Sequence, residues 1–130
     1  MKKLLFVCVE NSNRSQIAEA FARIHGSDRI EAYSAGSRPS GKINSKAITS
    51  MKEFDYDLHT HHSKSLEDIP DIIYDAVVTM GCGDACPWIA AHQREDWDIP
   101  DPREMNEVEF RKVRNLIEEK VLALLVALEK

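Results

Sequence analysis

The sequence has no long hydrophobic run and no basic excess. Its longest candidate run, residues 121–128, is much shorter than the roughly 20 residues that cross a membrane. A shorter apolar stretch follows two lysines near the amino terminus, but it ends at Glu10 without the small-residue cleavage site of a signal peptide. The formal net charge is −5, whereas general nucleic-acid binders carry an excess of basic residues. We therefore expect a cytoplasmic protein that binds neither membranes nor nucleic acids.

Cysteine is scarce as well, with three residues at Cys8, Cys82 and Cys86. An odd number of cysteines, without an export signal, argues against a structural disulfide framework. Cys82 and Cys86 are not accompanied by a second paired motif, so structural zinc is disfavoured and we expect no metal. Reactive thiols and inert core residues remain the alternatives, and the local sequence has to decide between them.

The composition is otherwise that of an ordinary globular protein, with 43% hydrophobic and 30% charged residues. A chain of 130 residues is long enough to bury a core without disulfides or metals. No internal repeat or linker divides it. We therefore predict one catalytic domain over residues 1–130.

The amino-terminal third has the pattern of a βαβ unit. Residues 3–9 form a continuous apolar run, which is typical of a strand buried on both faces of a parallel sheet. Ile17, Phe21 and Ile24 follow at helical spacing, and Gly26 is expected to end that helix. Residues 30–35 predict a second strand, closed by Gly36. The two strands should be parallel with a right-handed crossover.

The rest of the chain continues this alternation. A helix over residues 47–54 would be capped by Asn44 or Ser45, and residues 75–80 predict another buried strand. Residues 81–102 are interpreted mainly as loop, because they contain glycines and several prolines. The last helix follows Asn106. Its apolar stripe, interpreted as core packing, comprises Phe110, Val113, Ile117, Val121, Leu124 and Leu128.

Two cysteines fall at the carboxyl ends of predicted strands, the edge at which open parallel sheets bind ligands. Cys8 lies near the end of the first strand, and Cys82 comes two residues after Met80. More than seventy positions separate them in the sequence. The topology should bring them to one edge of the sheet.

The segment from Cys8 to Ser15 has the spacing of an anion-binding loop between a strand and a helix. Successive backbone N–H groups in such a loop can form a nest for an oxyanion, to which the helix adds its positive end. Arg14 would donate two hydrogen bonds to the anion, and Cys8 would lie beneath it as a thiolate nucleophile. The alternative is a buried cysteine followed by an ordinary capped turn. The predicted oxyanion loop comprises Val9, Glu10, Asn11, Ser12, Asn13, Arg14 and Ser15.

This loop, the following residues 16–19, residues 33–36 and the pair Asp101 and Pro102 resemble the low-molecular-weight tyrosine phosphatase superfamily. The resemblance covers nearly the whole chain and is closest to the thioredoxin-coupled arsenate reductases, because of Cys82 and Cys86. It implies an α/β fold with an open four-stranded parallel sheet, flanked by helices on both faces. It also implies a monomer that binds an oxyanion such as arsenate, phosphate or sulfate.

The resemblance further implies a relay of three thiols. Cys8 would attack arsenate, Cys82 would then attack the Cys8 sulfur and release arsenite, and Cys86 would take over the disulfide. Asp101 would be the general acid. No cofactor would be tightly bound, and reduced thioredoxin, or alternatively a glutaredoxin, would supply the electrons.

Other residues would support the loop by the same resemblance. Lys64 falls where potassium-binding reductases carry an acidic residue, so its ammonium would replace the ion; the alternative is a solvated surface lysine. Glu10 adds a negative charge to the anion loop and could weaken binding. His59, His61 and His62 are interpreted as loop residues. The predicted supporting residues are Asn11, Ser15, Glu19, Ser34 and Lys64.

Two competing functions remain. A phosphatase would hydrolyse phosphomonoesters through a phospho-Cys8 intermediate and would not need Cys82 or Cys86. Arg103 argues against a phosphotyrosine pocket, because the phosphatases carry an aromatic residue after the Asp-Pro pair. The second alternative is a non-enzymatic module that binds arsenite or acts as a redox partner through its thiols. That module would need neither Arg14 nor Asp101.

Overall fold

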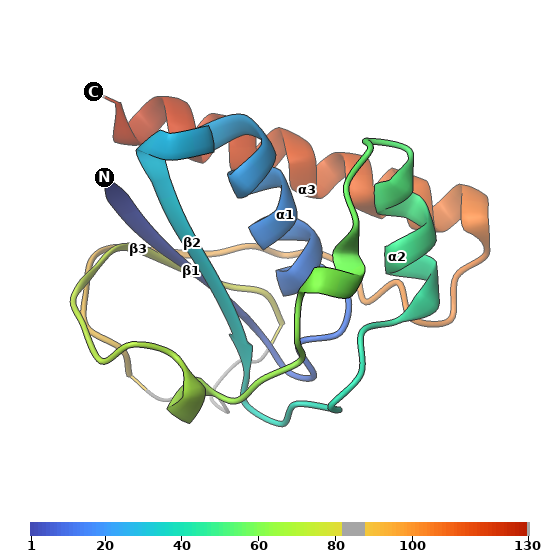
Figure 1. Ribbon diagram of the computed structural model, residues 1–130, viewed down its shortest axis with the longest axis horizontal. Coiled ribbons are helices and arrows are strands. Elements are labelled where there is room, and N and C mark those ends of the chain that lie inside the picture. The colour runs from blue at the N-terminus through green and yellow to red at the C-terminus, as the bar shows by residue number, and fades with distance from the viewer. Residues whose placement is uncertain (82–87, 130) are drawn as a thin grey trace.

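The computed structural model describes residues 1–81 and 88–129 of the chain. Its centre is a sheet of four parallel strands in the order β2-β1-β3-β4 (Figure 1). This confirms the predicted open four-stranded parallel sheet. The strands are β1 (Lys2–Cys8), β2 (Ile30–Gly36), β3 (Tyr74–Thr79) and β4 (Ala91–Asp96).

Among the described residues, two α-helices and three single turns of 3-10 helix connect the strands, and a third α-helix follows β4. The side chain of Asn44 caps α2 by accepting from the Lys46 N–H, and Asn106 caps α3 by accepting from the Glu109 N–H. The Asn44 cap agrees with the sequence prediction, and α3 begins directly after Asn106, as predicted. The helices are α1 (Arg14–Gly26), α2 (Ser45–Lys52), α3 (Glu107–Leu128), η1 (Ser27–Arg29), η2 (Leu58–Thr60) and η3 (Leu66–Asp68).

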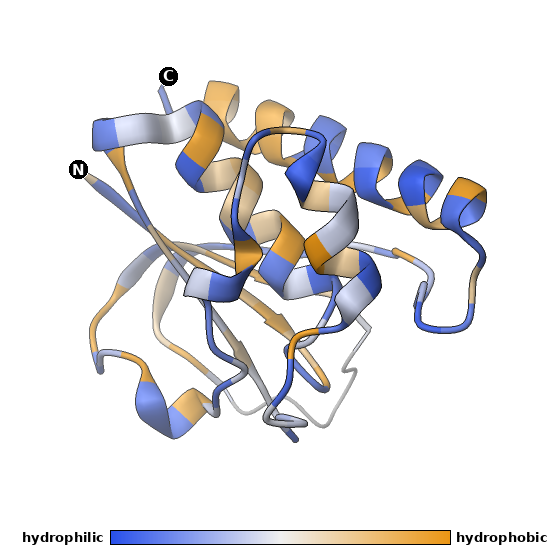
Figure 2. Cartoon of the chain, turned by 45° about the vertical axis from the view of Figure 1, so that its right-hand side comes forward, coloured by the Kyte–Doolittle hydropathy of each residue, from blue (hydrophilic) through white to orange (hydrophobic). Residues whose placement is uncertain are grey.

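Strand β1 lies between β2 and β3, and for that reason its sequence is apolar on both faces. Leu4 and Phe6 point to one side of the sheet, and Leu5 and Val7 to the other; all four are fully buried. Hydrophobic residues follow the strands and the helix faces turned toward them (Figure 2). The central strand ends at Cys8, which places this thiol at the carboxyl edge of the sheet.

The helical cover of the two faces is unequal. The three α-helices all pack on the face of Leu4 and Phe6, where they build the larger core (Figure 1). On the opposite face, η3 and its flanking chain cover a smaller cluster around Leu5 and Tyr74. Residues 66–74 contribute a few apolar side chains among one proline, Pro70, and three carboxylates, which suffices for one short turn and not for an α-helix.

Strand β4 corrects the interpretation of residues 81–102 as mainly loop. Its sequence from Ala91 to Asp96 is polar, and its residues alternate between half-buried and exposed positions. β4 is an edge strand with β3 as its partner, so it needs no apolar run and gives no hydrophobic signal. None of the helices described here is both long enough and apolar enough to span a bilayer.

Candidate active site

The loop from Val9 to Asn13 joins the end of β1 to the start of α1. Cys8 lies beneath it and is 3% exposed. Asn13 occupies the N-cap position of α1 but makes no side-chain capping bond, and its side-chain oxygen is buried without a hydrogen-bond partner among the described residues. The first backbone N–H groups of α1 are therefore available to a bound anion.

A chain of hydrogen bonds leads from this loop to the thiol. The Asn11 amide donates to the Ser15 hydroxyl oxygen at 2.7 Å, and that oxygen lies 2.9 Å from the Cys8 Sγ. Because Ser15 accepts from Asn11, its own proton is available for the sulfur. The Ser15 hydroxyl is therefore placed to donate a hydrogen bond to the Cys8 sulfur.

Asn11 adopts a left-handed backbone conformation with φ 52°, which asparagine tolerates better than most residues. Its side-chain oxygen accepts from the amide of Gln16 at 2.8 Å and from the backbone N–H of Lys64 at 2.9 Å. Its backbone oxygen also accepts from Gln16, at 3.1 Å. These bonds hold the turn of the oxyanion loop and orient the amide toward Ser15.

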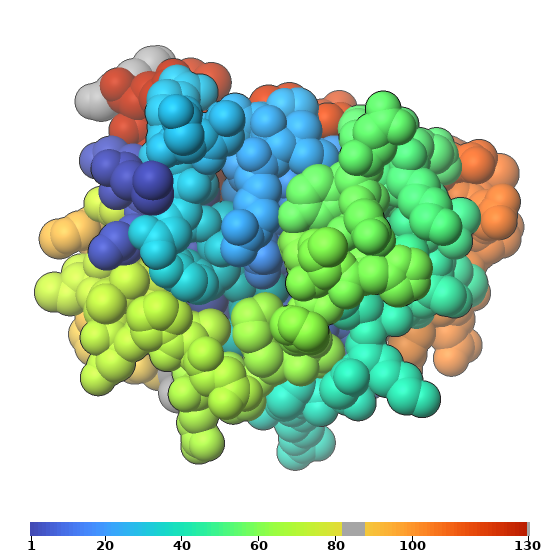
Figure 3. Space-filling model, viewed as in Figure 1, coloured from blue at the N-terminus to red at the C-terminus, as the bar shows by residue number. Residues whose placement is uncertain are grey.

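Gln16 and His61 are two residues of this network that sequence reasoning missed. Gln16 is fully buried, and besides contacting Asn11 it donates to the His62 backbone oxygen at 2.9 Å. Its carbonyl oxygen accepts from His61 Nδ1 at 2.9 Å. The segment that carries His61 lies directly against α1 (Figure 3). The available signal was the position of Gln16 directly after the oxyanion loop, within residues 16–19, which carry the family resemblance.

Gly36, at the end of β2, allows the loop to approach the sheet. A Cβ atom at this position would lie 2.6 Å from the Val9 carbonyl oxygen and 3.0 Å from Asn11. The backbone of the neighbouring residue Ser37 donates to the Cys8 oxygen at 3.2 Å. A glycine is therefore required where the strand passes beneath the loop.

Arg14 connects the oxyanion loop to the segment that carries Asp101. Its Nη1 atom donates to the Ile99 backbone oxygen at 3.0 Å. Gly81, with φ 82°, lies against the same guanidinium, and a Cβ there would be 2.5 Å from Nη1. The guanidinium is thus held at the wall of the site while other N–H groups remain for an anion.

Asp101 and Cys8 line one hollow in the surface of the protein. One of its carboxylate oxygens accepts from the Arg103 backbone N–H at 3.0 Å. Lys46, at the start of α2, donates to the backbone oxygens of Arg103 and Met105 at 3.2 and 2.8 Å. These contacts fix the chain around the carboxylate.

The hollow has a volume of about 520 Å³. It brings together a buried thiol, an arginine, the amino-terminal end of a helix and a carboxylate. This set can hold a tetrahedral oxyanion over a nucleophile and supply a proton to a leaving oxygen. Its lining residues are Cys8, Val9, Glu10, Ser12, Asn13, Arg14, Arg38, Gly81, Asp101 and Arg103.

The predicted supporting residues Glu19, Ser34 and Lys64 lie together behind the loop. Glu19 accepts from the Ser34 hydroxyl at 2.6 Å, and the Lys64 Nζ lies 3.8 Å from Glu19 and 3.5 Å from Ser34. Burial lowers the pKa of Lys64, and Glu19 partly opposes this effect. Burial also lowers the pKa of His61, again against the influence of Glu19. Lys64 is therefore a partly buried group beside the loop and not a freely solvated lysine.

Cys82 and Cys86 lie outside the described residues. Within residues 1–81 and 88–129, no group of three histidine, cysteine or acidic side chains is arranged to hold a metal ion.

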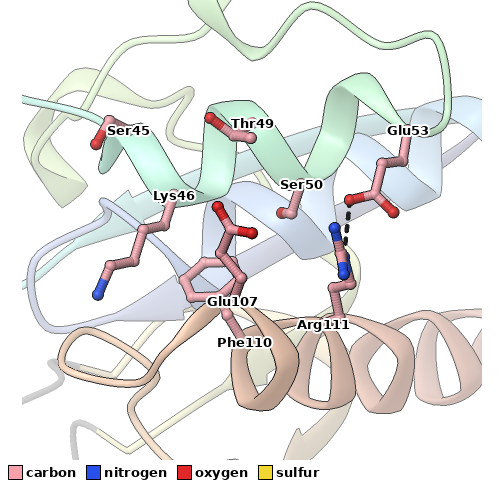
Figure 4. A pocket seen from close by; sticks show the side chains of 8 residues that line it. All are labelled: Ser45, Lys46, Thr49, Ser50, Glu53, Glu107, Phe110 and Arg111. Carbon is pink, nitrogen blue, oxygen red and sulfur yellow. Dashed lines mark hydrogen bonds and ion pairs between the residues drawn. The ribbon is translucent and has the colours of Figure 1, made fainter.

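A second hollow lies between α2 and α3, away from Cys8, and is lined by Lys46, Glu53, Phe110 and Arg111 among others (Figure 4). Its guanidinium, that of Arg111, is already paired with the Glu53 carboxylate, and its lining contains no cysteine.

Comparison with known proteins gives consistent results. The family model for low molecular weight phosphotyrosine protein phosphatase matches residues 3–130. A glutaredoxin arsenate reductase from Synechocystis sp. is 37% identical over 93% of this chain and 94% of that protein. The structure of an arsenate reductase in the phosphate binding state is 36% identical, with a TM-score of 0.89, over 98% of each chain. A thioredoxin-dependent arsenate reductase from Corynebacterium glutamicum is 27% identical, with a TM-score of 0.81, over 99% of this chain and 62% of that one.

Proposed function

Because the chain belongs to the low molecular weight phosphotyrosine protein phosphatase family, we propose that it uses the hollow lined by Cys8 to reduce arsenate to arsenite. The observation that supports the proposal is that Cys8, Arg14 and Asp101 line one hollow. Two further cysteines in the sequence and the names of its relatives favour reduction over hydrolysis.

In the first step the Cys8 thiolate attacks arsenic, and a sulfur–arsenic bond forms as an arsenic–oxygen bond breaks. Asp101 donates the proton with which that oxygen leaves as water. Arg14 and the N–H groups at the start of α1 stabilise the charge on the remaining oxygens. Ser15 stabilises the thiolate before attack, since it lies 2.9 Å from the sulfur.

The second step supplies the two electrons. The Cys82 thiolate attacks the Cys8 sulfur, a disulfide forms, and arsenite leaves with the electron pair of the sulfur–arsenic bond. Cys86 then attacks Cys82, which releases the Cys8 thiolate and leaves a Cys82–Cys86 disulfide. Both residues lie outside the described part of the chain, so this order rests on the family resemblance and on the electron count.

A dithiol protein reduces that disulfide, and we propose thioredoxin as the reductant. An internal disulfide is the form that a thioredoxin reduces by thiol exchange. One relative is named as thioredoxin-dependent and another as a glutaredoxin enzyme, so the experiment includes both reductants.

The reduced protein should be mixed with arsenate and NADPH, either with thioredoxin and its reductase or with glutathione, glutaredoxin and glutathione reductase. We expect NADPH oxidation with thioredoxin that is lost in Cys8→Ser, Cys82→Ser and Cys86→Ser. Hydrolysis of p-nitrophenyl phosphate is measured beside it, because it needs Cys8 but neither of the other thiols.

Ester hydrolysis that survives Cys82→Ser and Cys86→Ser, without arsenate turnover, would identify a phosphatase and overturn the proposal. Turnover with glutaredoxin alone would replace the proposed reductant. Arsenite binding without either activity would identify the non-enzymatic module.

A further inference from the structure

A carboxylate stands in the wall of a site that should bind anions. Glu10 belongs to the oxyanion loop and lines the same hollow as Cys8. Its side chain is 35% exposed and forms an ion pair with Arg103, whose Nη1 lies 3.1 and 3.3 Å from the two carboxylate oxygens. The pair therefore joins the loop that holds the anion to the segment that holds Asp101.

Both ends of this bridge are anchored through their backbones. The Glu10 backbone oxygen accepts from the Ser40 N–H at 3.1 Å and from the Ser63 hydroxyl at 3.0 Å. The Arg103 backbone donates to Asp101 and accepts from Lys46. The two side chains can separate, therefore, without moving the backbone on either side of the hollow.

We propose that Glu10 and Arg103 form an ion-pair latch at the mouth of the oxyanion site, and that an incoming dianion opens the latch by competing for Arg103. The latch sets how tightly this chain binds arsenate or phosphate. The inference rests on the proposed function in one respect, namely that the hollow binds a tetrahedral oxyanion.

Removing the charge of Glu10 and removing the charge of Arg103 should change the affinity for the anion in opposite directions. While Arg103 is paired, the charge of Glu10 is neutralised and the guanidinium is not available to the anion. A bound dianion offers Arg103 a higher charge and two oxygens in the geometry of a forked hydrogen bond. Removing the Glu10 charge should therefore strengthen anion binding, and removing the Arg103 charge should leave Glu10 unpaired and weaken it.

The test measures the binding of inorganic phosphate by calorimetry in four variants: Glu10→Gln, Arg103→Gln, the double variant and Arg111→Gln. Arg111 is the matched control, because it is an exposed arginine paired with Glu53 at 2.9 Å on the surface between α2 and α3, and its replacement changes the net charge equally (Figure 4). Thermal unfolding of each variant verifies that it is folded.

We expect the dissociation constant for phosphate to fall about two- to fivefold in Glu10→Gln and to rise about two- to fivefold in Arg103→Gln, the range of an exposed ion pair. The double variant should lie within about twofold of the original protein, because each loss offsets the other. Both shifts should shrink at high salt. In arsenate turnover the same shifts should appear in KM more than in kcat.

Shifts of the same sign in the two single variants would overturn the latch, as would an effect of Arg111→Gln as large as that of Arg103→Gln. Phosphate binding requires neither Cys82 nor Cys86, so it reports on the latch even if arsenate turnover fails. Conversely, if Glu10→Gln and Arg103→Gln leave the phosphate affinity unchanged while arsenate turnover is normal, the latch is refuted and the proposed function stands.

Discussion

Replacing Gln16 by leucine should remove hydrogen bonds that hold the oxyanion loop without creating a cavity in the core. Gln16 is fully buried and links the loop at Asn11 to His61 and His62. Leucine has a similar volume, so the cost comes from the lost hydrogen bonds and not from a cavity.

The size of the effect follows from the contacts. Two amide N–H groups of Gln16 share three acceptors, and its carbonyl oxygen accepts from His61, so about three hydrogen bonds disappear. At about 1 kcal/mol each, the free energy of unfolding should fall by about 3 kcal/mol. The loss is limited because Lys64 still donates to the Asn11 side chain and to the His62 backbone oxygen. For a chain of this length the melting temperature should drop by about 10 °C.

Urea titration and thermal melts measure this change, with Gln93→Leu on the edge strand β4 as the control. The Gln93 side chain donates to the neighbouring Glu95 carboxylate on the same strand, and we expect its replacement to change stability by less than about 0.5 kcal/mol. Phosphate affinity should fall in the Gln16 variant, because Asn11 loses its orientation. Equal stability of the two leucine variants would refute the assignment of Gln16 as the support of the loop.

Three further changes test neighbouring contacts. Ser15→Ala removes the donor to Cys8 and should slow both alkylation by iodoacetamide and arsenate turnover about tenfold; unchanged alkylation would contradict the role of Ser15. Gly36→Ala brings a Cβ to 2.6 Å from the Val9 oxygen and should lower the free energy of unfolding by about 1–3 kcal/mol, whereas an unchanged urea midpoint would show that the loop can yield. Burial lowers the pKa of His61, so the unfolded chain binds a proton at this residue first, and the free energy of unfolding should fall as the pH drops below about 6.5. Urea titrations at pH 7.5 and 5.5 should show a smaller decrease in the free energy of unfolding for His61→Gln than for the original protein. Equal decreases in the two proteins would be evidence against this effect of His61.

The central part of the fold can be predicted from the sequence because its signals are local. An apolar strand, a polar loop and a helix follow one another between Lys2 and Gly26, and parallel topology fixes which edge of the sheet Cys8 reaches. No local pattern places Asp101 at this edge, because it lies far from Cys8 in the sequence. That prediction came from the family resemblance. The structure places both residues in the wall of one hollow.

The residues that were missed lack such a local signal. Strand β4 is recognisable through its pairing with β3, which only the folded chain provides. His61 lies in a polar, histidine-containing segment, and its hydrogen-bond partner Gln16 is 45 positions away. The partner of Glu10 is 93 positions away, so the sequence shows an unfavourable charge but not the arginine that neutralises it.

The polar character of β4 also affects how copies of this chain meet. As the last strand in the sheet order, β4 turns one row of backbone donors and acceptors away from β3. His92, Arg94 and Asp96 are its exposed residues, and charged side chains on an edge disfavour the addition of a strand from another molecule. The sequence that made β4 hard to recognise thus protects this edge of the sheet from pairing with another molecule.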